Sequence, residues 1–171
     1  VVYLGMKGLG ILNYENFIIS GEKRIADNYI LNNQDNKVIF DVGANTGAWS
    51  CYIYDQCSHF QIHAFEPNEH LAYSLKHLNP NLIVNQCAVG SENGHIEMYD
   101  YQGNDNTSHA SAVSGVIELV HNQASKKYSV PLVSLDEYCQ KNEIKSIDFL
   151  KIDVEGFELD VLQGAQNLIK N

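Results

Sequence analysis

The sequence predicts one α/β domain built on a doubly wound, mostly parallel sheet with an inserted β-hairpin. Short apolar runs alternate with amphipathic segments of helical period along most of the chain. Strands separated by helices pair in parallel through right-handed crossovers. No repeat or linker divides the 171 residues, a length that suits a single core. We therefore expect residues 37–171 to form the main domain, preceded by a lead-in with a helix at residues 1–36.

Apolar runs rich in β-branched and aromatic residues predict four core strands. We expect these strands at residues 37–42, 61–67, 81–89 and 146–154. Pro67 ends the second strand because proline cannot donate a hydrogen bond to a sheet. Two further segments, 94–101 and 127–135, alternate apolar and polar residues, which predicts an antiparallel hairpin.

Helices are predicted where apolar residues recur at spacings of three and four. The first is 21–31, with Ser20 as a cap, and the second is the stretch that holds Trp49, Tyr52 and Ile53. The third is 68–79, with Leu71, Leu75 and Leu78 on one face. The last two are 134–142, which opens with the capping box "SLDE", and 156–170, with Phe157, Val161, Ala165 and Leu168 in one stripe.

The charge balance excludes several classes of partner. A formal net charge of −10 and a pI near 5.0 argue against binding to nucleic acid or to an anionic membrane. The apolar opening stretch is too short and too rich in glycine to span a bilayer. The four cysteines lack metal-ligand spacing, so we expect reduced thiols in a cytoplasmic protein and no metal site.

Three of the four predicted core strands end in acidic residues: Asp41, Glu66, and Asp153 with Glu155. The carboxyl ends of parallel strands meet at one edge of a sheet, which is where doubly wound proteins bind their ligands. Carboxylates gathered there are costly unless they bind something. This edge is therefore the predicted functional site.

The turn "DVGANTG" at 41–47 narrows the class of ligand. In the frame of the dinucleotide motif G-x-G-x-x-G that starts at Gly43, Asn45 and Ala48 replace the second and third glycines. A phosphate-binding P-loop also fails, because no Lys-Ser/Thr pair follows. Gly43 and Gly47 would leave room for a ligand, and the next helix N-terminus offers free amides to a carboxylate.

The acids near this turn suggest what else the ligand carries. Asp41 is suited to accept hydrogen bonds from an ammonium group, and Glu66 to accept both hydroxyls of a ribose. A ligand with a carboxylate, an ammonium group and a ribose but no phosphate is S-adenosyl-L-methionine.

Several longer stretches resemble the FkbM-type methyltransferases, a class I family dependent on S-adenosylmethionine. They are "VIFDVGANTGAWS", "AFEPN", "CAVGS" and "SLDEYCQKNEIKSIDFLKIDVEGFELDVLQGA". The resemblance covers about residues 20 to 169. It implies a Rossmann-like sheet of seven strands in the order 3-2-1-4-5-7-6, and this chain would be truncated after strand four. It also implies methyl transfer to small-molecule hydroxyls, often on sugars or other saccharides.

The resemblance and the pattern together assign the cofactor-binding residues. The turn and the second strand contribute Asp41, Gly43, Asn45, Gly47 and Glu66. Three further assignments have a structural alternative: Asn68 lies beside the adenosine or is a helix N-cap, and Ala88 and Val89 line the adenine pocket or belong to the core.

Asp153 and Glu155 are the candidate catalytic residues. Either carboxylate suits a base that removes the proton of an acceptor hydroxyl, or a ligand of a divalent cation. The alternative is that Asp153 bonds to the cofactor turn and Glu155 caps the next helix.

The predicted function is therefore O-methylation of a small-molecule or sugar hydroxyl. Two other functions stay open. One is an NAD-dependent oxidoreductase on a Rossmann-type sheet, against which Asn45 argues. The other is a non-catalytic scaffold, a remnant of the fold.

Overall fold

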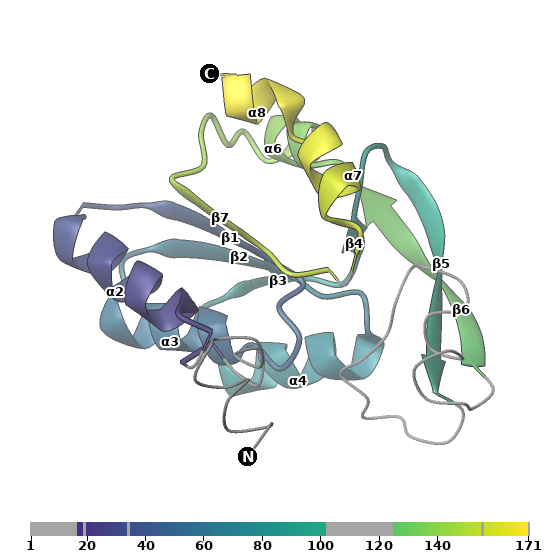
Figure 1. Ribbon diagram of the computed structural model, residues 1–171, viewed down its shortest axis with the longest axis horizontal. Coiled ribbons are helices and arrows are strands. Elements are labelled where there is room, and N and C mark those ends of the chain that lie inside the picture. Colours follow the sequence, from purple (N-terminus) through teal and green to yellow (C-terminus); the bar gives the residue numbers. More distant parts are fainter. Residues whose placement is uncertain (1–16, 19, 34, 102–124, 155, 171) are drawn as a thin grey trace, which may run out of the picture.

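The computed structural model describes residues 17–18, 20–33, 35–101, 125–154 and 156–170 (Figure 1). Its helices are α2 (Glu22–Asn32), α3 (Ala48–Gln56), α4 (Glu69–Leu78), α6 (Leu135–Lys141), α7 (Glu158–Gln163) and α8 (Gln166–Lys170). Its strands are β1 (Val38–Val42), β2 (Gln61–Phe65), β3 (Ile83–Asn85), β4 (Ala88–Val89), β5 (Gly94–Tyr101), β6 (Ser125–Val133) and β7 (Phe149–Ile152).

A parallel sheet in the order β3-β2-β1-β7 forms the centre of the molecule. Helices α2, α3 and α4 cover one face of it, and α6, α7 and α8 lie on the other (Figure 1). Each face has its own apolar core: Trp49, Ile53 and Leu75 belong to the first, and Phe40, Leu135 and Val161 to the second. The predicted doubly wound α/β fold is confirmed.

The predicted strand at 81–89 is wrong as one element, because the chain divides it between two sheets. β3 ends at Asn85, whose side-chain amide donates to the carbonyls of Ala64 and Ile83. A tight turn follows, in which Cys87 N donates to Asn85 O at 3.0 Å. β4 then pairs with β6 in a second sheet of order β4-β6-β5.

The predicted antiparallel hairpin is confirmed. β5 pairs with β6 from Gly94 opposite Leu132 to Tyr101 opposite Ser125. The polar segment between these strands lies outside the described residues. The hairpin lies beyond the carboxyl ends of the parallel strands (Figure 1). It therefore lies at the edge where the sequence predicts a ligand.

Two details of the predicted helices are wrong, and the burial of α4 differs from its apolar spacing. The C-terminal segment forms two short helices, because the chain turns at Gly164 and Ala165. Gly21, with a φ of 95°, is the N-cap of α2 in place of Ser20. On α4, Leu78 is 67% exposed, and Ala72 joins Leu75 as a buried residue.

The predicted capping box at 134–137 forms only in part. Ser134 Oγ accepts from Glu137 N, but Ser134 N donates to Asn93 Oδ1 at 2.8 Å. Asn93 also donates to the Glu137 carboxylate. Asn93 thus replaces the reciprocal bond from Glu137 and ties the β4–β5 turn to the start of α6.

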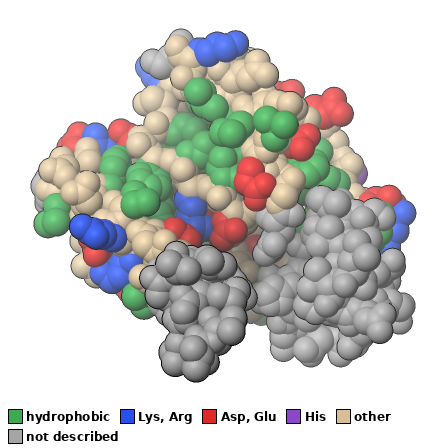
Figure 2. Space-filling model, in the orientation of Figure 1, with side chains coloured by type: hydrophobic (Ala, Val, Ile, Leu, Met, Phe, Trp, Pro, Cys, Tyr) green, Lys and Arg blue, Asp and Glu red, His purple; other side chains and the backbone are tan. Residues whose placement is uncertain are grey.

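Some apolar side chains of the C-terminal helices stay exposed, among them Leu159, Leu162 and Ile169. Figure 2 shows hydrophobic side chains at the surface over this part of the molecule. Within the described segments, no helix has the length and apolar character needed to cross a membrane.

Candidate functional site

A pocket opens at the carboxyl edge of the parallel sheet, between that sheet and the hairpin. Its empty space measures about 680 Å³, a volume that includes the part open to solvent. β1, β2, β4, β5 and the segment after β7 contribute to it. The lining residues are Val42, Gly43, Asn45, Phe65, Pro67, Cys87, Ala88, Val89, Ile96, Met98, Asp153, Val154 and Phe157.

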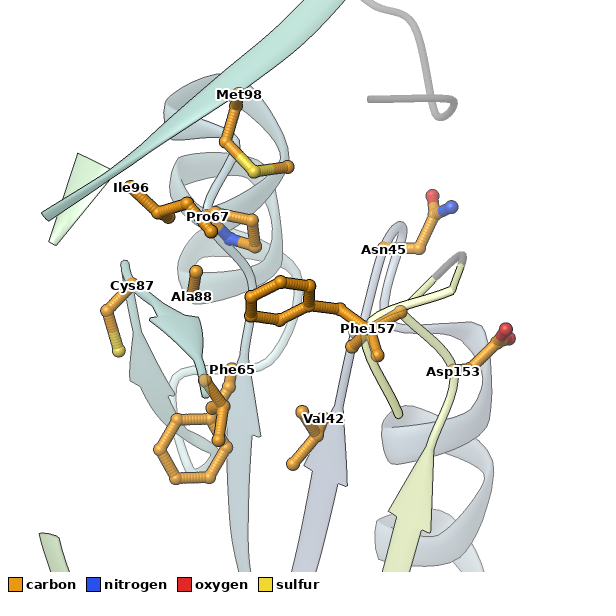
Figure 3. Close-up of a pocket in the computed structure, with 13 residues that line it drawn as sticks. Val42, Asn45, Phe65, Pro67, Cys87, Ala88, Ile96, Met98, Asp153 and Phe157 are labelled. Atoms are coloured by element: carbon orange, nitrogen blue, oxygen red, sulfur yellow. The ribbon is translucent and has the colours of Figure 1, made fainter. Parts of the chain in front are cut away.

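One wall of the pocket is apolar and comes from both sheets. Ile96 and Met98 of β5 face Phe157, whose ring projects across the middle of the pocket (Figure 3). A glycine allows this position of the ring, because a Cβ at Gly90 would lie 3.0 Å from Phe157 Cε1. Such a wall suits a flat, weakly polar ring system.

The glycine turn is shaped by the protein around it. Gly43 has a φ of 81°, and a Cβ there would lie 1.9 Å from the backbone oxygen of Asp153. Gly47 has a φ of 77°, and its Cβ would lie 2.0 Å from Leu75 Cδ1. These glycines therefore make room for the β7 end and for α4, a reason that the sequence alone did not predict. Gly43 also lines the pocket, whereas Gly47 does not.

Glu66 holds two turns together beneath the pocket. Its Oε2 accepts from Asn45 N at 2.7 Å and its Oε1 accepts from Asn68 N at 2.8 Å. Asn45 has a φ of 52°, in the left-handed region that non-glycine residues seldom adopt. The hydrogen bond from its N–H to Glu66 stabilises this conformation of the turn. Glu66 is 6% exposed, and burial raises the pKa of its carboxyl although both backbone N–H groups lower it.

Asn68 is the N-cap of α4, as one of the two alternatives predicted. Its Oδ1 accepts from His70 N at 3.0 Å and from Leu71 N at 3.2 Å. Neither Asn68 nor Glu66 lines the pocket, but Pro67 between them does. Of the residues predicted for the adenine side, Ala88 and Val89 both line it.

Asp41 lies below the pocket lining and is fully buried. Its Oδ2 accepts from Ser50 Oγ at 2.7 Å, and its Oδ1 lies 3.3 Å from the ammonium group of Lys151. Burial raises the pKa of the Asp41 carboxyl, while Lys151 and Ser50 oppose that rise. Asp41 thus already pairs with an ammonium group that the protein itself supplies.

Asp153 is the one acidic side chain among the described residues that line the pocket. Its side chain is 64% exposed, and its Oδ2 lies 3.5 Å from Lys151 Nζ. In Figure 3 the Asp153 carboxylate lies on the far side of Phe157 from Cys87 and Ile96, at the edge of the pocket, and points away from the Phe157 ring. Glu155, the other predicted catalytic residue, lies outside the described residues. In the described part of the chain, no group of three or more His, Cys, Asp or Glu side chains is placed to hold a metal ion.

These residues fit a ligand with an aromatic ring at one end and a cationic group at the other. The apolar wall of Phe65, Ile96 and Met98 suits the ring, and Asp153 supplies a negative charge at the other side. Among the described residues, neither lysine nor arginine lines the pocket. The lining therefore lacks the cationic side chains that bind phosphate groups. S-adenosylmethionine, which carries adenine and a sulfonium ion, fits this distribution.

Sequence reasoning missed several residues of this site. Ile96 and Met98 were assigned only to a hairpin, and the alternation that places them on one face of β5 was the available signal. Phe157 was assigned to a helical stripe, although it precedes α7 and points into the pocket. Lys151 carried the plainest signal, since it interrupts the apolar run "DFLKI".

Comparison with known proteins bears on this site. The model of the methyltransferase FkbM domain matches residues 41–171. The hexuronic acid methyltransferase AglP of Haloferax volcanii is 24% identical over 157 residues, covering 90% of this chain and 60% of the relative. The 2-O-methyltransferase NoeI of Sinorhizobium fredii is 27% identical over 143 residues, covering 77% of this chain and 58% of the relative.

A methyltransferase of Beauveria bassiana is also similar, with 25% identity over 149 residues, 78% of this chain and 60% of the relative. The chain thus spans about three-fifths of the length of the curated relatives that it matches. No solved structure matches it. With most of the chain covered by one family model, and with the parallel sheet and the pocket at its carboxyl edge, this chain belongs to the FkbM family of S-adenosylmethionine-dependent methyltransferases.

Proposed function

We propose that this protein binds S-adenosylmethionine in the pocket and transfers its methyl group to a hydroxyl oxygen of a sugar. The observation that carries the proposal is the pocket itself. It lies at the carboxyl edge of the sheet, with an apolar wall on one side and Asp153 on the other. Membership of the FkbM family supports the choice of methyl donor.

The chain's own residues would hold the cofactor in three ways. The wall that contains Ala88, Val89 and Met98 packs against the adenine ring. Glu66 does not itself line the pocket but lies between the lining residues Phe65 and Pro67, and the lone pairs that its two backbone N–H bonds leave over would accept the ribose hydroxyls. The turn at Gly43 and Asn45 contacts the amino-acid end, and Asp41, which pairs with Lys151, lies on β1 just before this turn.

The reaction needs one proton acceptor. When bound, S-adenosylmethionine would supply a methyl group on a positively charged sulfur, which is a good leaving group for transfer to a hydroxyl oxygen held close to it. Asp153 accepts the proton that the hydroxyl loses, because it is an exposed carboxylate on the lining of the pocket. Glu155 stays a predicted second acid at the same edge.

The relatives suggest the class of acceptor. One is named for hexuronic acid and another for 2-O-methylation. Both names indicate hydroxylated acceptors, so we assign a saccharide hydroxyl to this chain as part of the proposal. The negative net charge makes nucleic acid an unsuitable acceptor.

Calorimetric titration of the purified protein with S-adenosylhomocysteine tests the cofactor, with NADH titrated in parallel. We expect micromolar binding of S-adenosylhomocysteine and none of NADH. Glu66→Gln should weaken that binding by about tenfold or more, because a hydrogen bond to a charged group contributes about 1.5–3 kcal/mol.

Glu69→Gln is the matched control, since the same change is then made on the exposed first turn of α4. Its affinity should equal that of the wild type. Thermal unfolding of each variant checks that the turns at Asn45 and Asn68 remain folded. Binding of NADH in place of S-adenosylhomocysteine would contradict the proposal, as would a folded protein that binds neither.

A further inference from the structure

A largely buried lysine side chain lies on β7, the edge strand of the parallel sheet. Lys151 belongs to β7, directly opposite Asp41 of β1 in the parallel register, and its side chain is only 11% exposed. Buried parallel strands are normally continuous apolar runs, and an ammonium group there is costly unless it is paired. Lys151 therefore needs a reason beyond the packing of the sheet.

The ammonium group of Lys151 contacts two carboxylates. It lies 3.3 Å from Asp41 Oδ1 and 3.5 Å from Asp153 Oδ2. Trp49 of α3 packs nearby, with its ring centre 6.0 Å from Nζ, and Glu22 of α2 adds a third negative charge. Burial alone would lower the pKa of Lys151, but these carboxylates raise it above its ordinary value. The side chain is thus a cation.

The two carboxylates that meet at Lys151 differ in freedom. Asp41 is fully buried and is also bonded to Ser50 Oγ at 2.7 Å, so its position is fixed by the core. Asp153 is 64% exposed at the end of β7 and lines the pocket. An exposed aspartate without a partner samples several rotamers. Lys151 connects the fixed carboxylate to the exposed one.

We propose that Lys151 is a positioning residue, anchored by Asp41, that fixes the orientation of the Asp153 carboxylate at the edge of the pocket. This inference rests on the proposed function, in which Asp153 accepts the hydroxyl proton. Stability alone does not account for the arrangement, since a buried ion pair can often be replaced by apolar side chains at no cost. A role in orienting Asp153 does account for it, because orientation of the base contributes directly to the rate.

The test must separate orientation from folding. Lys151→Met alone leaves the Asp41 charge buried without its cation, which lowers Tm whatever else Lys151 does. The double variant Asp41→Asn/Lys151→Met removes both charges and should recover Tm. Asp153→Asn gives the rate that remains without the base.

We expect the double variant to lose about 10- to 100-fold in kcat, approaching Asp153→Asn, with KM for the saccharide acceptor within about threefold. The matched control is Lys37→Met. Lys37 is similarly buried and also meets two carboxylates, Asp35 at 3.1 Å and Asp148 at 3.3 Å, but at the opposite end of β1. Its kcat should equal that of the wild type.

A second measurement does not depend on activity. Three-bond NMR couplings from Asp153 Cγ to the backbone report its χ1 rotamer in the full chain. One dominant rotamer in the wild type and averaging in the double variant are expected. A folded double variant with wild-type kcat, or with an unchanged Asp153 rotamer, would overturn the role of Lys151.

Failure of the proposed function has a different signature. In that case the wild type binds no S-adenosylhomocysteine, while the Asp153 couplings still report whether Lys151 orients the carboxylate.

Discussion

Two buried carboxylates at the sheet edge are stabilised by different means. Asp41 pairs with the charged side chain of Lys151, whereas Glu66 accepts two backbone N–H groups. A charged partner from a neighbouring strand fixes the relation of β1 to β7. Backbone donors instead fix the turns on either side of Glu66. At the residue scale, therefore, Asp41 connects two strands of the sheet, whereas Glu66 connects two turns.

His63 is a buried titratable residue outside the pocket lining. Its Nδ1 lies 2.8 Å from the Tyr138 hydroxyl, which donates to Asn85 Oδ1 at 3.1 Å. The hydroxyl therefore accepts from Nδ1–H, and no hydrogen-bond partner reaches Nε2 in the described part of the chain. Burial lowers the pKa of His63 from 6.5 to about 4. The folded protein thus holds His63 neutral.

His63 should lower the free energy of unfolding as the solution becomes more acidic. Between pH 6.5 and pH 4 the unfolded chain binds a proton at His63 that the folded chain does not, so the free energy of unfolding drops as pH falls through this window. The loss amounts to about 3 kcal/mol when complete. Urea unfolding between pH 7 and pH 4 measures it.

His63→Phe should reduce that pH dependence by up to one proton while keeping the ring contact with Phe40, whose centre lies 5.0 Å away. The wild type at the same ionic strength is the reference. An equal slope in the two proteins would mean that His63 is not the group responsible.

At this scale, residue types at the site were predictable but their partners were not. The failed dinucleotide motif at Asn45 and the acids after the strands follow from spacing alone. The contact of Gly43 with the Asp153 backbone and the pairing of Lys151 with Asp41 depend on strand register. The register of β1 with β7 joins residues more than a hundred positions apart, so the local pattern around either residue does not identify its partner.

At the scale of elements, the joint between α7 and α8 packs unusually close to the β4–β5 turn. A Cβ at Gly164 would lie 2.0 Å from the backbone oxygen of Gly90. Gly164 has a φ of −78°, so contact and not backbone strain requires glycine there. The break in the predicted 156–170 helix thus lies where two backbones meet.

Gly164→Ala should therefore lower the free energy of unfolding by about 2 kcal/mol or more, because a backbone oxygen cannot rotate away from the added methyl group. Gly94→Ala is the matched control, since a Cβ there meets nothing within 4 Å. It should leave stability unchanged or raise it by up to about 1 kcal/mol. Denaturant unfolding compares the two. Equal free energies of unfolding for Gly164→Ala and Gly94→Ala would show that the chain at the α7–α8 joint shifts to accommodate the methyl group at little cost.

Most helices and strands were predictable because the spacing of apolar residues within each segment indicates its secondary structure. The exceptions are places where tertiary contacts override the local pattern. The run at 81–89 reads as one strand, yet Asn85 bonds to Ala64 and the chain leaves the first sheet. The stripe at 156–170 reads as one helix, yet the approach of Gly90 interrupts it.

At the scale of the whole molecule, the pocket belongs to neither sheet alone. The parallel sheet supplies Val42 and Phe65, and the hairpin supplies Ile96 and Met98. The fold class and the sheet edge that holds the pocket were predictable from chain order. The wall from the hairpin was not, because it depends on how the two sheets pack.

Met98→Ala tests this wall. Met98 is 6% exposed and lines the pocket, so its truncation should weaken binding of S-adenosylhomocysteine by about tenfold through lost apolar contact. His95→Ala changes an exposed residue on the same strand and should leave the affinity unchanged. Calorimetry measures both. Equal affinities for Met98→Ala and the wild type would place the ligand away from the hairpin.

The pairing of the hairpin has a consequence for changes in length of the segment between its strands. Its base is held by register, with Leu132 opposite both Gly94 and Ala88. The chain between Tyr101 and Ser125 joins two paired residues at the far end. Insertions there cost little, since doubling the length of a loop costs only about 0.6 kcal/mol. Changes in the length of that segment would therefore leave the β5–β6 register, and with it the pocket wall of Ile96 and Met98, unchanged.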